Sequence, residues 1–205
     1  MALDGSTREQ ILSEARELFL RQGLSGFSMR LVAERVGVSA TALYRHFDDK
    51  DALLASMLAD AFGTFGSYLG RCLAGRTPLA RFRQCGSAYV DFALERPRDY
   101  ELMFLTNCRD LGFKKIKSEV DQRSQPTFEI VVERAQECMA AGVFAPGDAR
   151  EAALYSWATL HGLVSLWLLG QLKEAFDEAA FRAQSERTLD PIELSLASRQ
   201  KAQRK

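Results

Sequence analysis

Positively charged side chains gather in one short stretch of a chain that is otherwise balanced in charge. Residues 28–47 contain three arginines and one acid, namely Arg30, Arg35, Arg45 and Glu34. Over the whole chain, Lys plus Arg and Asp plus Glu each number 27, so the formal net charge is zero. A protein without net positive charge binds nucleic acid only through a local basic patch. We therefore expect contact with a polyanion to come from a local patch centred on residues 28–47.

Two short helices separated by a glycine turn are predicted to carry this patch. Ser28 is placed to cap a helix from Met29 to Val36, and Gly37 makes the turn. Ser39 then caps a second helix from Ala40 to His46. This pattern predicts a helix-turn-helix for DNA, in which the second helix enters the major groove.

The second helix has an apolar side and an outward side. Leu43 and Phe47 are expected to point into the core. The side chains that face outward or border the core are Ala40, Thr41, Ala42, Tyr44, Arg45 and His46. A surface of this size and polarity suits the major groove.

The second helix ends in a short signature. The pattern LYxHF, a polar turn and a lysine are formed by Leu43, Tyr44, His46, Phe47 and Lys50. This resembles the DNA-binding domain of the tetracycline-repressor (TetR) family, and the similarity covers residues 7 to 54. The segment WATLHGLVSL at 157–166 resembles C-terminal domains of that family with lower specificity.

The resemblance implies which side chains meet the bases. Arg30, Thr41, Ala42 and Arg45 occupy the positions that face base edges. Arginine pairs bidentately with guanine, and alanine or the threonine methyl group touches thymine. Because Ala40 and Ala42 form no side-chain hydrogen bonds, we expect readout to depend on the two arginines and on DNA shape.

The resemblance also implies phosphate contacts. Tyr44, His46 and Lys50 match the positions at which the family contacts phosphates, which set register without reading sequence. The complete predicted DNA-binding set is Ser28, Arg30, Ser39, Ala40, Thr41, Ala42, Tyr44, Arg45, His46 and Lys50.

Aromatic residues are frequent between residues 62 and 167. A helical bundle lined in this way holds either a solid core or a cavity, and the resemblance favours a cavity for a small-molecule inducer between the fourth and eighth helices. The predicted ligand-binding set is Phe62, Phe65, Phe82, Tyr89, Phe92, Phe104, Asn107, Phe128, Trp157 and His161. Each of them can instead serve as core packing. His161 is the most informative, because a neutral histidine in an apolar helix either bonds locally or faces a polar ligand.

Helix start and stop signals run through the rest of the chain without any strand pattern, so the predicted fold class is all-α. The helices expected beyond the motif are 50–74, 78–96, 126–141, 152–172 and 173–188. The expected domains are a helix-turn-helix DNA-binding domain at 1–50, a helical ligand-binding and dimerisation domain at 51–190, and a polar tail at 191–205.

The predicted helix at 152–172 carries no formal charge over its 21 residues, which meets the length criterion for a membrane span. Polar residues and two glycines interrupt it, so we interpret it as a buried helix or a dimer interface. A homodimer also matches the two halves of a palindromic DNA site. We therefore expect a homodimer with no membrane contact.

Other chemistries find little support in the sequence. The four cysteines, Cys72, Cys85, Cys108 and Cys138, form no CxxC pair, so we expect reduced buried thiols, no metal and no cofactor, with a redox sensor as the alternative. The chain begins with no signal-peptide pattern, which favours the cytoplasm. No catalytic motif is present, so no enzyme is expected.

These features predict a ligand-responsive, sequence-specific transcription factor, most often a repressor in this family, which binds a pseudo-palindromic operator as a homodimer. Two alternatives stay open. One is a helical adaptor whose DNA module is vestigial and whose apolar helix binds a protein partner. The other is a cavity enzyme built around His161.

Overall fold

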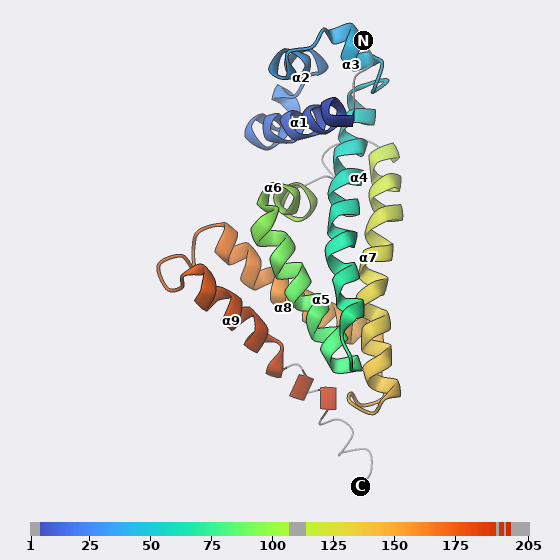
Figure 1. Cartoon of the computed structure of the whole chain (residues 1–205), viewed down its shortest axis with the longest axis vertical. Helices are drawn as coiled ribbons and strands as arrows, with labels where there is room; N and C mark the ends of the chain where they lie inside the picture. Colours follow the sequence, from blue (N-terminus) through green and yellow to red (C-terminus); the bar gives the residue numbers. More distant parts are fainter. Residues whose placement is uncertain (1–4, 107–113, 192, 195, 198–205) are drawn as a thin grey trace. The chain divides into compact units, whose positions relative to one another are not determined.

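The computed structural model describes residues 5–106, 114–191, 193–194 and 196–197 (Figure 1). Within these residues the chain forms helices and no strand, which confirms the all-α class. The elements in chain order are α1 (Gly5–Gly26), α2 (Met29–Val36), α3 (Ala40–Tyr44), α4 (Lys50–Leu69), η1 (Gly70–Ala74), α5 (Pro78–Glu95), α6 (Pro97–Tyr100), η2 (Glu101–Leu105), α7 (Lys114–Ala140), α8 (Ala149–Leu168) and α9 (Glu178–Thr188).

The chain divides into two compact units. The first comprises Met1–Thr64 with Arg98–Ser124, and the second comprises Phe65–Pro97 with Gln125–Lys205. The predicted domain boundary after residue 50 falls at the first turn of α4, whereas the compact units divide within α4. The assignment of functions to 1–50, 51–190 and 191–205 stays a prediction.

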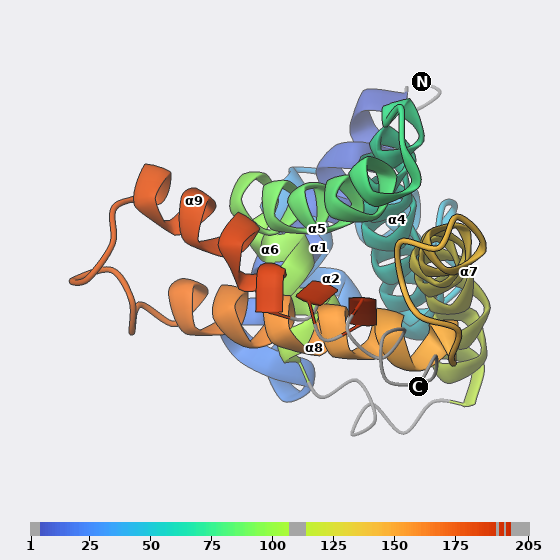
Figure 2. The same ribbon diagram turned by 90° about the horizontal axis from the view of Figure 1, so that it is seen from below.

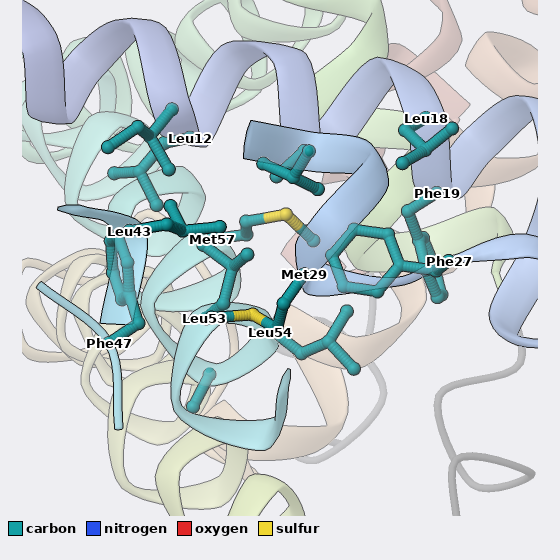
Figure 3. Packing of buried hydrophobic residues seen from close by; sticks show 14 of the residues in the cluster. Leu12, Leu18, Phe19, Phe27, Met29, Leu43, Phe47, Leu53, Leu54 and Met57 are labelled. Atoms are coloured by element: carbon teal, nitrogen blue, oxygen red, sulfur yellow. The ribbon is translucent and has the colours of Figure 1, made fainter. Parts of the chain in front are cut away.

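In the first unit, α1, α2, α3 and the start of α4 share one apolar core (Figure 3). Leu18 of α1, Val32 of α2, Leu43 of α3 and Met57 of α4 are each 0% exposed. Burial of such a side chain contributes roughly 1.5–3 kcal/mol. Every helix of the motif is therefore anchored by at least one buried residue.

Glycine and serine residues set the kink in α1 and the two ends of α2. The chain leaves the helical conformation within α1 at Gly23, whose φ is +63°. Ser28 Oγ accepts a hydrogen bond from the Leu31 N–H at 3.3 Å, which caps α2. Gly37, with φ of +76°, ends α2 in the left-handed region that favours glycine. The predicted bounds of α2 are confirmed.

A buried ionic cluster, which the sequence did not indicate, joins three elements of the first unit. Arg16 of α1 lies 2.7 Å from Asp99 of α6 through Nε and 3.1 Å from Asp60 of α4 through Nη2. The side chains of Arg16 and Asp99 are 8% and 2% exposed. Charges removed from water in this way depend on each other, because losing one leaves the other buried and unpaired.

In the second unit, α5, α8 and α9 pack against one another (Figure 2). Thr77 Oγ1 accepts the Ala80 N–H at 3.1 Å and starts α5, and Asp148 caps α8. A second core joins α5, α7 and α8 and includes Phe82, Cys138 and Phe144. Phe82 and Phe144 meet edge to face with their ring centroids 5.2 Å apart.

Two predicted helices have a wrong bound: the one predicted at 126–141 at its start, and the one predicted at 50–74 at its end. Pro126 does not open a helix but lies inside α7. An interior proline removes one backbone donor without forbidding a helix, and Pro126 is exposed, so water can bind the carbonyl that loses its partner. The helix predicted at 50–74 is α-helical only to Leu69 and continues as the 3₁₀ segment η1.

The C-terminal helices also differ from their predicted bounds. The helix expected at 152–172 is α8, which begins at Ala149 and ends at Leu168, and the helix expected at 173–188 is α9, which begins at Glu178. Part of the predicted tail is packed: Glu193 is 8% exposed and bonds Arg83 at 2.5 Å. The polar composition of this segment predicts a loose tail, but the ion pair between Glu193 and Arg83 holds it against α5.

Among the described helices, one is long and apolar enough to cross a membrane, and it is not the helix at 152–172. The candidate is Lys50–Ala74, formed by α4 and η1, and 56% of its most apolar window is buried inside the protein. Buried core helices share this composition.

Candidate functional site

The orientation of α3 is fixed by its cap and by one buried leucine. Ser39 Oγ accepts a hydrogen bond from the Ala42 N–H at 3.1 Å, and Leu43 is 0% exposed. The α-helix ends at Tyr44, earlier than predicted, and Arg45 and His46 lie in the turn that follows. The predicted caps Ser28 and Ser39 therefore use their oxygens as acceptors, and their hydroxyl protons stay available for a phosphate.

The sides of α3 are as the sequence predicts. Leu43 and Phe47 are buried, with Phe47 3% exposed, and Ala42 is half-buried. Together with Arg30 of α2, the exposed side chains define what we call the recognition surface: Arg30, Ala40, Thr41, Tyr44, Arg45 and His46. This surface places donors, an aromatic ring and small side chains on one short helix and its flanks.

The three arginines of this region are not equivalent. Arg35 Nε donates to Glu14 Oε2 of α1 at 3.1 Å, so its charge is partly neutralised. Arg30 and Arg45 are exposed, and neither forms an ion pair with any residue in the described part of the chain. Both guanidinium groups are therefore free to bind an external acceptor.

Lys50 has a structural contact that the sequence did not indicate. Its Nζ donates to the Leu24 carbonyl at 2.8 Å and lies 5.5 Å from the centroid of the Phe27 ring. These contacts tie the first turn of α4 to the end of α1 and to Phe27, which lies between α1 and α2. An ammonium group has three donors, so the predicted phosphate contact of Lys50 stays compatible with this position.

The second unit brings most of the predicted ligand-binding residues into one aromatic cluster. Its members, contributed by α4, α5, α7 and α8, are Phe65, Tyr89, Phe92, Phe128, Trp157 and His161. Adjacent ring centroids lie between 5.0 Å, for Phe65 and Phe92, and 6.1 Å, for Phe128 and Trp157. The rings touch edge to face or tilted, as aromatic quadrupoles prefer.

A polar pair lies within this aromatic cluster. Tyr89 Oη and His161 Nδ1 are 2.8 Å apart and share a hydrogen bond whose direction depends on the imidazole tautomer. Burial lowers the pKa of His161 below its ordinary value, because a desolvated imidazolium is disfavoured. A neutral histidine beside a phenol can both donate to and accept from a ligand's polar group.

Three predicted ligand residues lie elsewhere in the described part of the chain. Phe82 packs on Phe144 in the separate core of α5, α7 and α8. Phe62 and Phe104 belong to the first compact unit, where Phe104 lies 5.0 Å from the Tyr100 ring. Asn107 lies outside the described residues.

One neighbour of the aromatic cluster was not selected as a site residue. The Tyr68 ring lies 5.6 Å from Phe92, and its hydroxyl donates to Glu95 Oε2 at 2.6 Å. The hydrogen bond to Glu95 raises the pKa of Tyr68. Helical spacing is the signal that could have found it, because Tyr68 lies three residues after Phe65 and shares its face.

Comparison with known families accounts for both units. Residues 11–57 match the bacterial regulatory proteins of the tetR family, and residues 82–190 match the tetracyclin repressor-like C-terminal domain. The second match alone covers more than half of the chain. This chain belongs to the TetR family.

Curated relatives of this TetR-family chain are regulators of transcription. It is 34% identical to the regulator TcmR of Streptomyces glaucescens over 96 residues. These residues make up 47% of this chain and 41% of TcmR. It is 25% identical over 142 residues to the repressor KstR2 of Mycolicibacterium smegmatis, 69% of either protein. The chain spans about half the length of several of these relatives, for example 53% of YobS of Bacillus subtilis.

Solved structures show that the TetR-family fold extends over nearly the whole chain. A protein with unknown function from Rhodococcus sp. RHA1 is 31% identical, with a TM-score of 0.76 over 96% of this chain and 98% of that chain. FadR of Bacillus subtilis, solved in complex with stearoyl-CoA, shares the fold at 16% identity, with a TM-score of 0.73 over 90% of this chain and 96% of FadR. The two TetR matches contain the whole predicted DNA-binding set and, of the aromatic cluster, all but Phe65.

Proposed function

We propose that this protein is a cytoplasmic, ligand-responsive transcription factor of the repressor type, which binds a pseudo-palindromic DNA operator as a homodimer. The observation that carries this proposal is the recognition surface on a capped helix-turn-helix, with Arg30 and Arg45 exposed and outside any ion pair of the described chain. A buried core fixes α3, and its outward residues Ala40, Thr41 and Tyr44 are exposed. Such preorganisation is what groove binding requires.

The roles of the recognition surface follow from its chemistry. Arg30 and Arg45 donate to guanine edges, and the methyl groups of Thr41 and Ala42 contact thymine. Tyr44, which is 51% exposed, reaches a phosphate with its hydroxyl. The His46 ring and the remaining donors of Lys50 complete the phosphate contacts.

Homodimer formation is supported by an apolar stripe on α8. Leu154, Ala158, Gly162 and Leu166 follow one another at intervals of four residues, and all four are exposed. Leu169, just past the helix, is 65% exposed. An apolar stripe that is open to water in one chain is expected to be covered by a second copy related by a two-fold axis.

The inducer is proposed to bind at the aromatic cluster of the second unit. Six contacting rings favour a largely apolar molecule, and the Tyr89–His161 pair suits a single polar group on it. The relatives named above are regulators, which supports ligand sensing rather than turnover. Turnover that is lost in His161→Ala would instead support the enzyme alternative.

Selection of bound duplexes from a random DNA library tests the proposed function. The expected product is an inverted repeat, because two α3 helices of a homodimer read equivalent half-sites. Arg45→Ala should weaken recovery of that repeat, and Arg76→Ala, an exposed arginine of the second unit, should leave it unchanged. Recovery of no sequence above the unselected pool would overturn DNA recognition and favour the adaptor alternative.

A further inference from the structure

A cation of α1 lies against the aromatic ring that follows α3. The guanidinium carbon of Arg8 is 5.8 Å from the centroid of the Phe47 ring. This distance is within the range of a cation–π interaction. Both residues belong to the first unit, and Phe47 is 3% exposed whereas Arg8 is exposed. The ring therefore holds the side chain of Arg8 at the end of the helix-turn-helix, with the charged group in water.

The position of Arg8 in α1 explains this contact. Arg8 lies four residues before Leu12 and seven before Ala15, which are 1% and 0% exposed. Residues at this spacing share one face of a helix. Leu12 and Phe47 belong to the same apolar core (Figure 3). Arg8 thus begins the buried face of α1, at the point where this core meets solvent.

Arg8 differs from another cation that lies over a ring in this unit. The Lys50 ammonium, over Phe27, already donates a hydrogen bond to the Leu24 carbonyl. Arg8 forms no hydrogen bond or ion pair with any residue that the structure describes. A guanidinium group has five N–H donors, and contact with a ring face leaves them in place. Arg8 can therefore bind an external anion without breaking an ionic contact in the described part of the chain.

We propose that Arg8 is a phosphate-binding residue, which extends the DNA contact from the helix-turn-helix to α1. This inference rests on the proposed function, because the phosphate belongs to the same DNA. The rings of Phe47 and His46 have centroids 6.4 Å apart, so Phe47 contacts both Arg8 and a predicted phosphate-binding residue. Arginine forms bidentate hydrogen bonds with a phosphate, which add affinity and orientation but carry no sequence information.

The test measures the affinity of the full chain for the selected operator and for a scrambled duplex over a range of salt concentration. Arg8→Ala should weaken binding to both duplexes by the same factor, because a phosphate contact reads no base. The slope of log affinity against log salt concentration should become less steep by about one for each protomer that loses the contact, since fewer counterions are released. Arg8→Lys keeps the charge and should retain the wild-type slope.

Arg21→Ala is the matched control. Arg21 lies near the other end of α1, 3.7 Å from Glu17, and its side chain is 63% exposed. Its removal takes the same charge from the same helix, so a general effect of net charge on DNA affinity would appear in both variants. We expect the wild-type slope in Arg21→Ala, which would leave the change in Arg8→Ala to the phosphate contact.

Other results would overturn the proposal. An unchanged slope in Arg8→Ala, or an equal change in Arg21→Ala, excludes the phosphate contact while the wild-type protein still prefers its operator. A relaxed preference at one base position assigns Arg8 to base reading instead. Weaker binding with an unchanged slope and a lower melting temperature without DNA assigns Arg8 to packing on Phe47. If the wild-type chain itself shows no preference for the operator, the proposed function fails, and this inference fails with it.

Discussion

The helix-turn-helix and the aromatic cluster are built from interactions of different range. In the first, Ser39 caps α3 by bonding a backbone group three residues away, and Gly37 ends α2 with its own backbone conformation. In the second, the central hydrogen bond joins Tyr89 to His161, which are 72 residues apart. When a site is built from local interactions, its residues can be predicted one by one from the sequence. When a site is built from distant contacts, the sequence predicts only which residue types are frequent, not which of them lie together.

The largest expected effect concerns the buried ionic cluster of the first unit. This cluster joins residues that are far apart in the sequence, so the first unit does not depend on local interactions alone. Arg16→Met removes the cation that neutralises Asp99, whose side chain is 2% exposed. A buried charge left without its partner typically costs about 3–5 kcal/mol. Urea denaturation should show a loss of this size in the free energy of unfolding.

Arg21→Met is the control for that measurement. Arg21 lies in the same helix, 3.7 Å from Glu17, and its side chain is 63% exposed. Exposed pairs of this kind contribute about 0.5 kcal/mol or less. If the Arg16 and Arg21 variants lost equal stability, the ionic cluster would have no special role.

The second prediction separates two roles within the recognition surface. Arg30→Ala should lose about 1–3 kcal/mol of binding to the selected operator and relax the preference at one position per half-site. Tyr44→Ala should weaken binding to all sequences nearly equally, because a phosphate contact carries no sequence information. Competition with single-base operator variants measures both effects, and an identical loss of specificity in the two variants would contradict the assignment.

The third prediction concerns the local signals directly. Ser39→Ala removes the oxygen that accepts the Ala42 N–H and should cost about 1 kcal/mol of stability. Ser13→Ala, at an exposed position inside α1, should be neutral or slightly stabilising, since alanine is the better helix former. Thermal unfolding of the two variants side by side provides the measurement, and a neutral Ser39→Ala would show that the core alone positions α3.

The smallest expected effect lies in the aromatic cluster and depends on pH. Burial lowers the pKa of His161, so the unfolded chain takes up this proton at a higher pH than the folded chain does. The free energy of unfolding should therefore decline as the pH falls below about 6.5 and level off below the folded pKa. His161→Phe should lose this component, and His46→Phe, which leaves the Tyr89–His161 bond in place, should retain it. An unchanged pH profile in His161→Phe would show that the imidazole is not desolvated.

The features predicted well from sequence are those whose cause lies within a few residues. Ser28, Ser39 and Gly37 were assigned correctly because caps and left-handed turns restrict which residue types can occupy them. Pro126 was assigned wrongly because the same proline can start a helix or lie exposed within one. The packed position of Glu193 could not be predicted, since its partner Arg83 is 110 residues earlier in the chain.

The candidate sites divide in the same way. The outward and inward positions of α3 follow from helical period. Arg30 of α2 and Arg45 after α3 follow from the resemblance to the family, and both are exposed. In the second unit, composition identified aromatic residues but not their grouping. Phe82 belongs to the predicted ligand-binding set, but it packs in another core. The sequence around an aromatic residue in a helix does not show which distant residues will contact it.

Affinity for the selected operator relative to a scrambled duplex, measured over a range of salt concentration, tests sequence-specific DNA binding by this protein most directly. We expect the operator to bind at least about 10³-fold more tightly near physiological salt, because specific complexes exceed non-specific ones by this factor or more. Both affinities should fall steeply with salt as phosphate contacts release counterions. Equal affinity for the two duplexes, or binding that does not respond to salt, would contradict recognition of DNA by the helix-turn-helix.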